Sequence, residues 1–299
     1  MHKTVLLNEA IEGLGLTTKS VVIDGTFGGG GHSLEICKRY PGIKIIAFDQ
    51  DKSVFEKAVE KFKGLDCDIS FYNKNFRNLN EVLEKEGVNE VDAIIFDLGL
   101  SSDQLENSGR GFSFMRDEPL LMTMKKNPTS SDITAQDAVN TWGEESLADI
   151  IYGYGEERRA RSIAREIVGW RKKSEIKTTF DLVKIIERAI PVKFRRGSSK
   201  PRLHYATKTF QAIRIAINDE LGALREGLDK GYKFLKKGGR MSIISFHSLE
   251  DRIVKRFFKK QAEENLAKLI NKKPIIATKE EIKNNPRSRS AKLRILEKK

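Results

Sequence analysis

The amino-acid sequence predicts an α/β protein with a doubly wound, largely parallel sheet and an inserted helical subdomain. Two observations lead to this prediction. First, short apolar runs of strand length alternate with stretches of helical periodicity, and the runs are apolar throughout, as in strands that helices cover on both faces. Second, this alternation stops near Asp103 and resumes after about Tyr205, which indicates a helical segment placed within an α/β core.

The segment before the break carries four strand patterns and three helix patterns in strict alternation. The expected strands are residues 20–27, 43–49, 68–76 and 91–100, and the expected helices are residues 32–40, 52–64 and 78–87. Such alternation is typical of strand–helix–strand units that build a parallel sheet.

The break itself contains helical periodicity at residues 146–170 and 179–190 and few strand signals. The α/β pattern then resumes with a long helix at residues 207–235, a turn at 236–239, a strand at 240–247 and a helix at 248–264. We therefore expect a core formed by residues 1–104 and 207–299, the latter ending in a basic C-terminal tail. Residues 105–206 are expected to form a helical insert that recognises the substrate.

Composition narrows the classes of partner. The 299-residue chain carries a net charge of +13 and has a pI near 9.5, which favours a polyanionic partner. The excess is concentrated in residues 192–208, which contain no acid, and in residues 284–299. With no membrane-length apolar run and no leader pattern near the N-terminus, we expect a cytoplasmic protein. Cys37 and Cys67 are too few for a zinc site or a disulfide framework, so we expect buried thiols and no metal.

Four consecutive glycines, Gly28 to Gly31, follow the first expected strand. Such a run is tolerated where a ligand approaches the backbone closely, and in doubly wound folds this turn is where ligands bind. A dinucleotide site would need G-x-G-x-x-G, but Ser33 takes the place of the third glycine. S-adenosylmethionine has the same adenosine without the pyrophosphate, and its amine and carboxylate can meet backbone groups and Asp24. The turn fits this second ligand better.

Three further residues follow the next strands along the chain. Asp49 ends the second expected strand, where a carboxylate can accept hydrogen bonds from ribose hydroxyls; the structural alternative is a cap on the next helix. Phe76 ends the third, where it would pack on adenine or in the core. Asp97 ends the fourth, where a carboxylate can hold an amino group so that its nitrogen lone pair faces the methyl donor.

Seven motifs resemble the ribosomal RNA small subunit methyltransferase H family, of the MraW type. They are GTFGGGGHS, FDLGLSSDQL, RGFSF, GEERRARSIAREI, ATKTFQAIRIAINDEL, ISFHSLEDRIVK and NPRSRSAKLR, and they cover nearly the whole chain. The resemblance implies a class I methyltransferase fold and S-adenosylmethionine-dependent N4-methylation of a cytidine in the decoding region of 16S rRNA. The partner that it implies is the small ribosomal subunit; the oligomeric state is left open.

The resemblance also implies which residues contact the cofactor. They are Gly30, Gly31, His32, Asp49, Phe76, Asp97 and Gln104. His247, after the expected strand at residues 240–247, is expected to line the same site; it is either a base for the proton released on methylation or a structural histidine.

The chain departs from the family pattern at two places. Residues 119–125 read PLLMTMK where the family usually reads PLDMRMD, and residues 204–207 read HYAT where it reads HPAT. The first departure lies near the expected target pocket, where Phe112 and Phe114 are candidates for stacking on a flipped base or for ordinary packing.

Two other classes of function stay open at this point. A nicotinamide-dependent oxidoreductase would explain the glycine turn but not Ser33 or the basic segments. A noncatalytic RNA-binding or assembly protein with a vestigial cofactor site would explain the departure at residues 119–125.

Overall fold

The computed structural model describes residues 4–191 and 204–299 and divides the chain into two compact units. The sheet unit is Met1–Gly99 with Leu221–Lys299, and the helical unit is Leu100–Glu220. An inserted helical unit is therefore present, but it begins before residue 105 and ends after residue 206. The basic segment predicted at residues 192–208 lies largely outside the described residues.

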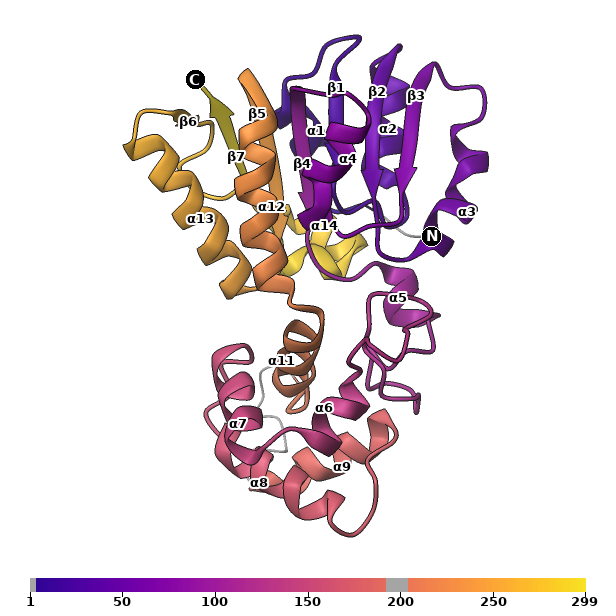
Figure 1. The fold of residues 1–299 in the computed structure, drawn as a ribbon. Helices are drawn as coiled ribbons and strands as arrows, with labels where there is room; N and C mark the ends of the chain where they lie inside the picture. Colours follow the sequence, from indigo (N-terminus) through magenta and orange to yellow (C-terminus); the bar gives the residue numbers. More distant parts are fainter. Residues whose placement is uncertain (1–3, 192–203) are drawn as a thin grey trace. The chain divides into compact units, whose positions relative to one another are not determined.

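A seven-stranded sheet forms the centre of the sheet unit (Figure 1). Its strands are β1 (Val21–Asp24), β2 (Ile43–Phe48), β3 (Cys67–Tyr72), β4 (Val91–Asp97), β5 (Leu235–Ser245), β6 (Ala267–Leu269) and β7 (Lys292–Lys298). The strand order is β3-β2-β1-β4-β5-β7-β6, in which β1 to β5 are parallel and β7 runs antiparallel to both neighbours. The predicted doubly wound, class I methyltransferase fold is confirmed.

Helices cover both faces of this sheet. The helical elements of the unit are α1 (Leu7–Leu14), α2 (Gly31–Arg39), α3 (Lys52–Phe62), η1 (Phe76–Asn78), α4 (Leu79–Lys85), α12 (Glu220–Phe234), α13 (Ser248–Glu263), α14 (Lys279–Asn284) and η2 (Pro286–Ser290). Successive strand residues alternate between two buried clusters, so that Val22 packs with α1 to α3 and Ile23 packs with α4, α12 and α13. Burial on both faces explains why these strands are apolar without interruption.

The C-terminal segment is a core strand rather than the predicted basic tail. Leu293, Ile295 and Leu296 of β7 are at most 3% exposed. Helix α1, which the sequence analysis did not predict, packs on this strand so closely that a Cβ on Gly13 would lie 2.4 Å from Cδ1 of Ile295. The basic residues between the apolar ones obscured the strand pattern, although one of them, Arg294, is itself buried.

The helical unit has a core of its own, formed by the apolar faces of its helices. Its helices are α5 (Ser102–Glu106), α6 (Ala135–Thr141), α7 (Glu144–Gly153), α8 (Ala160–Arg171), α9 (Thr179–Ala189) and α11 (Thr207–Asn218). The long helix predicted at residues 207–235 is two helices, because Asp219 between α11 and α12 adopts a left-handed φ of 45°. The apolar face of α11 belongs to the helical core, which moves the end of this unit beyond residue 206.

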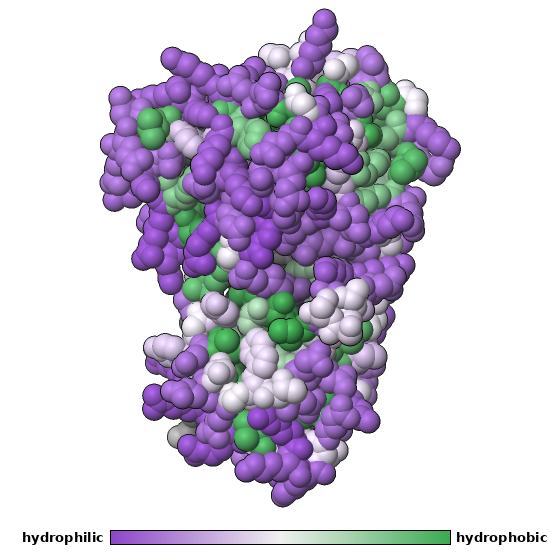
Figure 2. Space-filling view, viewed as in Figure 1, coloured by the Kyte–Doolittle hydropathy of each residue, from purple (hydrophilic) through white to green (hydrophobic). Residues whose placement is uncertain are grey.

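The visible surface is mostly hydrophilic, as the charge content leads one to expect (Figure 2). Across residues 4–191 and 204–299, none of the helices combines the length and the apolar character needed to cross a bilayer.

The two cysteines form a disulfide, which corrects the expectation of buried thiols. Cys37 of α2 and Cys67 of β3 are bonded, with their Cα atoms 5.6 Å apart. Their separation in sequence is 30 residues, but α2 and β3 both lie beside β2 in the fold. Sequence spacing carried no sign of this proximity, which arises from the order of the strands.

Reduction of this disulfide should lower the stability of the sheet unit. The bond closes a loop of about 30 residues, for which chain entropy predicts a stabilisation of about 3–4 kcal/mol. Urea unfolding with and without reductant should therefore differ by a free energy of unfolding of about 2–4 kcal/mol. Cys37→Ser should unfold at the reduced midpoint under both conditions. Identical wild-type midpoints with and without reductant would contradict the prediction.

Candidate active site

The predicted site residues of the sheet unit gather at the carboxyl edge of its parallel strands. Asp24 is the last residue of β1 and Asp97 the last residue of β4, and Asp49 directly follows β2. These three strands are neighbours in the sheet, so their carboxyl ends meet at one edge.

Hydrogen bonds to Asp24 hold the glycine turn on the end of β1. Asp24 is buried, and its Oδ2 accepts a 2.6 Å hydrogen bond from the hydroxyl of Ser33, while its Oδ1 accepts one from the backbone N–H of Thr26. Ser33 therefore uses its position, where a dinucleotide fingerprint has glycine, to tie α2 to the end of β1. Burial raises the pKa of Asp24 to about 6, although the bonds from Ser33 and Thr26 lower it and the charge of Asp49 raises it further.

The turn itself needs glycine for two different reasons. Gly28 and Gly30 adopt left-handed φ angles of 52° and 73°, which disfavour side chains. At Gly31 the constraint is space, since a Cβ would lie 1.9 Å from Oγ1 of Thr4. Gly30 is also the N-cap of α2 and has no side chain with which to bond the first N–H groups of the helix. Those N–H groups suit a carboxylate ligand.

Asp49 braces the glycine turn. Its Oδ2 accepts a 2.8 Å hydrogen bond from the N–H of Gly28 and its Oδ1 accepts one of 2.8 Å from the N–H of Asp51. The alternative role of capping the next helix belongs to Asp51, whose side chain accepts a bond from the N–H of Ser53 at the start of α3. The predicted role of Asp49 toward ribose hydroxyls stays a prediction.

Phe76 lies just beyond the third strand rather than within it. β3 ends at Tyr72, and Phe76 begins η1. Its half-buried ring lies 4.7 Å from that of Phe96, and a Cβ on Gly227 would lie 2.5 Å from it. The core-packing role is therefore filled by this ring, and contact with adenine stays a prediction.

Asp97 is the most perturbed acid of the edge. Its backbone N–H donates to Oγ1 of Thr26 at 2.5 Å, and Nδ1 of His32 lies 3.7 Å from its Oδ2. Its Oδ1 is buried and, among the described residues, has no hydrogen-bond partner. Burial and the neighbouring charges of Asp24 and Glu250 raise the pKa of Asp97 to about 8. A buried oxygen that lacks a donor is suited to a ligand that brings one.

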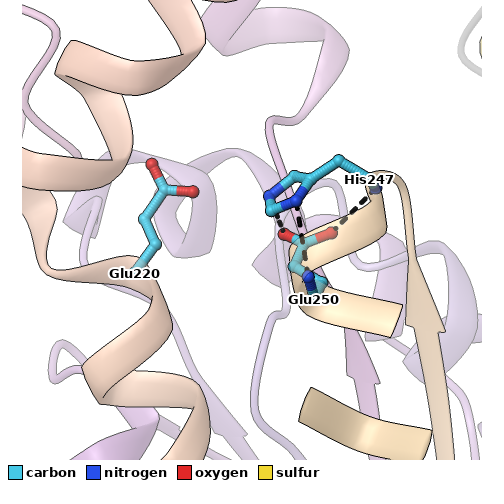
Figure 3. Close-up of side chains that lie close together, drawn as sticks. All are labelled: Glu220, His247 and Glu250. Carbon is cyan, nitrogen blue, oxygen red and sulfur yellow. Dashed lines mark hydrogen bonds and ion pairs between the residues drawn. The ribbon is translucent and has the colours of Figure 1, made fainter. Parts of the chain in front are cut away.

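His247 is held by a capping interaction at the start of α13 (Figure 3). Its Nδ1 accepts a bond from the N–H of Glu250, and the Glu250 carboxylate accepts bonds from the N–H groups of Phe246 and His247. Nε2 of His247 lies 3.1 Å from Oε1 of Glu250. The structural role that the sequence allowed is filled, and the catalytic role stays a prediction.

Glu250 and Asp251 are consecutive residues of α13 but have different surroundings. Glu250 is 3% exposed and contributes negative charge to the site. Asp251 binds Arg294 at 2.7 Å and Lys292 at 3.2 Å. Burial alone would raise the pKa of Asp251, but the bonds from Arg294 and Lys292 outweigh it and leave the pKa lowered. At the start of a helix both acids also suit the macrodipole, but the sequence alone did not distinguish their roles.

Gln104 belongs to the helical unit, in α5. It completes a capping box in which its Oε1 accepts a bond from the N–H of Ser101, and its Nε2 lies 3.8 Å from Sδ of Met124. The predicted cofactor contact of Gln104 stays a prediction.

The two stacking candidates of the helical unit differ in burial. Phe112 is 7% exposed and belongs to the helical core, which favours its packing role. Phe114 is half-buried, and its ring is stacked at 4.6 Å on that of His204, the first residue of the HYAT departure. Burial lowers the pKa of His204, although the charge of Glu187 opposes the shift.

The departing segment at residues 119–125 is well integrated into the helical unit. Arg110 donates to the carbonyls of Thr123 and Met124, and the Asn218 side chain bonds the carbonyl of Met122 and the N–H of Met124. These bonds use backbone groups, so they are independent of the side chains that depart from the family pattern.

Comparison with known proteins decides the family. The MraW methylase family matches residues 1–299. The chain belongs to this family. Curated members named ribosomal RNA small subunit methyltransferase H include those of Limosilactobacillus fermentum, 42% identical over 99% of this chain and 98% of the relative, and of Clostridioides difficile, 44% identical over the same shares. A solved rRNA methylase from Streptococcus thermophilus is 12% identical over 100% of this chain and 98% of its own, with a TM-score of 0.46.

The residues present fit the cofactor that MraW methylases are expected to use. S-adenosylmethionine carries a sulfonium and an amine, both cationic, and the edge presents a row of acids: Asp49, Asp24, Asp97 and Glu250. Their mutual repulsion contributes to the raised pKa values of Asp24 and Asp97, and a cation beside them would relieve it. The uncapped start of α2 suits the carboxylate.

The pKa of Asp97 yields a prediction about stability. Below pH 4 the carboxyl is protonated in the folded and the unfolded chain. Between about pH 4 and 8 the Asp97 carboxyl is ionised in the unfolded chain but still protonated in the folded chain, because its folded pKa is near 8. The free energy of unfolding should therefore fall as pH rises through this range. Asp97→Asn should remove this loss and stabilise the cofactor-free protein at pH 8 by about 1–3 kcal/mol, less than the full shift implies because the side chain is 25% exposed.

Urea unfolding of both proteins between pH 5 and 8 (roughly the range of the shift) measures this effect. Asp251→Asn is the matched control of opposite sign, since its partners Arg294 and Lys292 favour the charged form and it should destabilise at neutral pH. Parallel stability profiles for wild type and Asp97→Asn would contradict the prediction.

Proposed function

We propose that this protein is an S-adenosylmethionine-dependent methyltransferase that methylates N4 of a cytidine in the decoding region of 16S rRNA, in the cytoplasm. The observation that carries the proposal is the buried Oδ1 of Asp97, which finds no hydrogen-bond partner within residues 4–191 and 204–299 and lies beside an acid-lined glycine turn. Family membership, the names of the curated relatives and the net charge of +13 support rRNA as the substrate.

Asp97 acts on the amino group of the target base. An exocyclic amine donates one N–H to a carboxyl oxygen, and this bond turns the nitrogen lone pair toward the incoming carbon. When bound, S-adenosylmethionine supplies a methyl carbon on a good leaving group. The N–C bond forms as the S–C bond breaks, and the nitrogen then loses a proton. Positioning is therefore the main contribution of Asp97, and no strong base is required.

The other residues of the site organise the binding of the donor. Asp49 faces the ribose hydroxyls while it holds the glycine turn through Gly28. Asp24 and Ser33 keep that turn on β1. The target base must be unpaired or flipped to reach Asp97, because its amino group is otherwise engaged in pairing.

Two alternatives are less well supported. The nicotinamide-dependent oxidoreductase lacks the third glycine of its fingerprint, and Ser33 there is engaged with Asp24. Detection of nicotinamide cofactor in the purified protein would revive it. A noncatalytic RNA-binding protein would leave the acid row at the sheet edge without a purpose, at a cost in stability.

Transfer of a labelled methyl group to unmodified small subunits, or to their RNA, tests the proposal. We expect wild-type protein to methylate a single cytidine at N4, identified by mass spectrometry of nucleosides. Asp97→Ala should lower kcat by about 100-fold, as expected when a positioning contact is lost. Equal transfer by Asp97→Ala and wild type would refute the role of Asp97, and the absence of transfer by wild type would refute the activity.

Asp49 and Asp51 provide a matched pair for the donor site. Asp49→Ala should weaken the binding of S-adenosylmethionine by about tenfold or more, through loss of ribose bonds and of the brace on Gly28. Asp51→Ala should cost about 1 kcal/mol of stability through loss of the α3 cap but leave affinity within about threefold. Calorimetry and urea unfolding separate the two. Equal losses of affinity would count against the ribose contact.

His247→Asn tests the two roles of this histidine. Asparagine can accept the same capping bond from the N–H of Glu250, so a structural role predicts a kcat within a few-fold of wild type. A general base would instead cost on the order of 100-fold, with a changed pH profile. We expect the first outcome, measured as kcat between pH 6 and 9 (about the range in which a base would titrate).

A further inference from the structure

A pocket of about 270 Å³ lies at the same edge of the sheet unit, on the far side of β5 from Asp97. Three segments line it: the residues after β5, the segment from Ile276 to Ile282, and η2 with the start of β7. β7 pairs antiparallel with β5, so its first residue Lys292 lies opposite Ser245 at the carboxyl end of β5. The pocket therefore adjoins the acid-lined site, and His247, which interacts with Glu250 of that site, lines the pocket as well.

One side of the pocket is apolar. It is formed by Phe246 and Ile282, both half-buried, and by Ile276, which is 64% exposed. An isoleucine this exposed at the rim of a pocket, next to an aromatic ring, offers a surface on which a planar ring can stack.

The other side of the pocket is cationic. The exposed Arg289 has no acidic partner among the described residues. Lys292 shares the single carboxylate of Asp251 with Arg294, so the three leave a net positive charge. A guanidinium that is not already paired suits a phosphate, which it can bind through two parallel hydrogen bonds.

Phe246 connects the pocket to Asp97. A Cβ on Gly99, in the loop after Asp97, would lie 3.4 Å from the Phe246 ring, so the ring contacts this loop and also lines the pocket. β4 and β7 are separated by β5 alone, a distance of roughly 10 Å at the usual strand spacing. A group in the pocket is too far from Asp97 to receive the methyl but close enough to belong to the same nucleic-acid strand.

We propose that this pocket binds a nucleotide that neighbours the target cytidine in the same unpaired RNA strand. Its base packs on Phe246 and Ile276, and its phosphate is bound by Arg289 with support from Lys292. The inference rests on the proposed function, to which it adds a second point of attachment for the substrate. Holding the neighbouring nucleotide here fixes the direction in which the strand crosses Asp97.

Arg289 and Arg287 provide the matched comparison, since both lie on η2 but Arg287 does not line the pocket. With unmodified small subunits as substrate, Arg289→Ala should raise KM by about tenfold and leave kcat within about twofold. It should also lower the slope of log KM against the logarithm of the salt concentration by about 0.7, the value expected when one contact with a phosphate of single-stranded RNA is lost. Arg287→Ala should raise KM by less than about threefold. Affinity for S-adenosylmethionine should be unchanged in both.

Modified RNA locates the contact. A series of single-stranded oligonucleotides spans the target, and each carries a single neutral methylphosphonate linkage or a single abasic site at a different position. Their binding is measured by fluorescence anisotropy. At one linkage near the target, the methylphosphonate should weaken binding by wild type as much as Arg289→Ala weakens binding of the unmodified RNA. The same methylphosphonate should not weaken binding by Arg289→Ala any further, because the contact is already lost. One abasic site beside that linkage should weaken binding by wild type as much as Ile276→Ser weakens binding of the unmodified RNA, and it should not weaken binding by Ile276→Ser further.

Three results would overturn the inference. They are equal effects of Arg289→Ala and Arg287→Ala, a loss for Arg289→Ala at every linkage, and an effect of Ile276→Ser that no abasic site abolishes. Failure of the proposed function is distinguishable, because it appears as absent methyl transfer by wild type while the binding measurements with oligonucleotides still test the pocket.

Discussion

The buried hydrogen bond from Ser33 to Asp24 is the contact on which the site depends. It joins the start of α2 to the end of β1, and the glycine turn is the chain between these two points. A carboxyl group in so buried a place is costly, and its pKa near 6 expresses that cost. The bond from Ser33 offsets part of it and fixes the path of the turn. A glycine at this position would leave Asp24 without its strongest partner.

The parallel sheet places Asp24 next to other acids, so that their charges repel one another. Because parallel strands end at one edge, acids that are far apart in the sequence form a row there, from Asp49 through Asp24 and Asp97 to Glu250. Each member disfavours ionisation of the next, and burial amplifies the effect. The protein thus stores repulsion at the place where a cationic donor and an amino group are expected to meet, a common relation between strain and function.

The two units differ in what they carry. The sheet unit carries the row of acids, yet at the same edge, beyond β5, it also carries Arg289 and Lys292. β5 lies between β4, which ends in Asp97, and β7, which begins at Lys292. The helical unit has an independent core, within which the departing residues 119–125 are held by backbone hydrogen bonds from Arg110 and Asn218. Its departures therefore leave its fold intact.

The sequence by itself determined the fold class, the helical insertion and the positions of the acids, because buried parallel strands and helix faces leave periodic patterns that local chemistry imposes. Only the tertiary structure decided the features that depend on contacts between distant segments. These are the disulfide between Cys37 and Cys67, the strand formed by the basic C-terminal segment, and the closure of the acid row by Glu250. Strand order brings such segments together, and it is not encoded in the spacing of residues along any one of them.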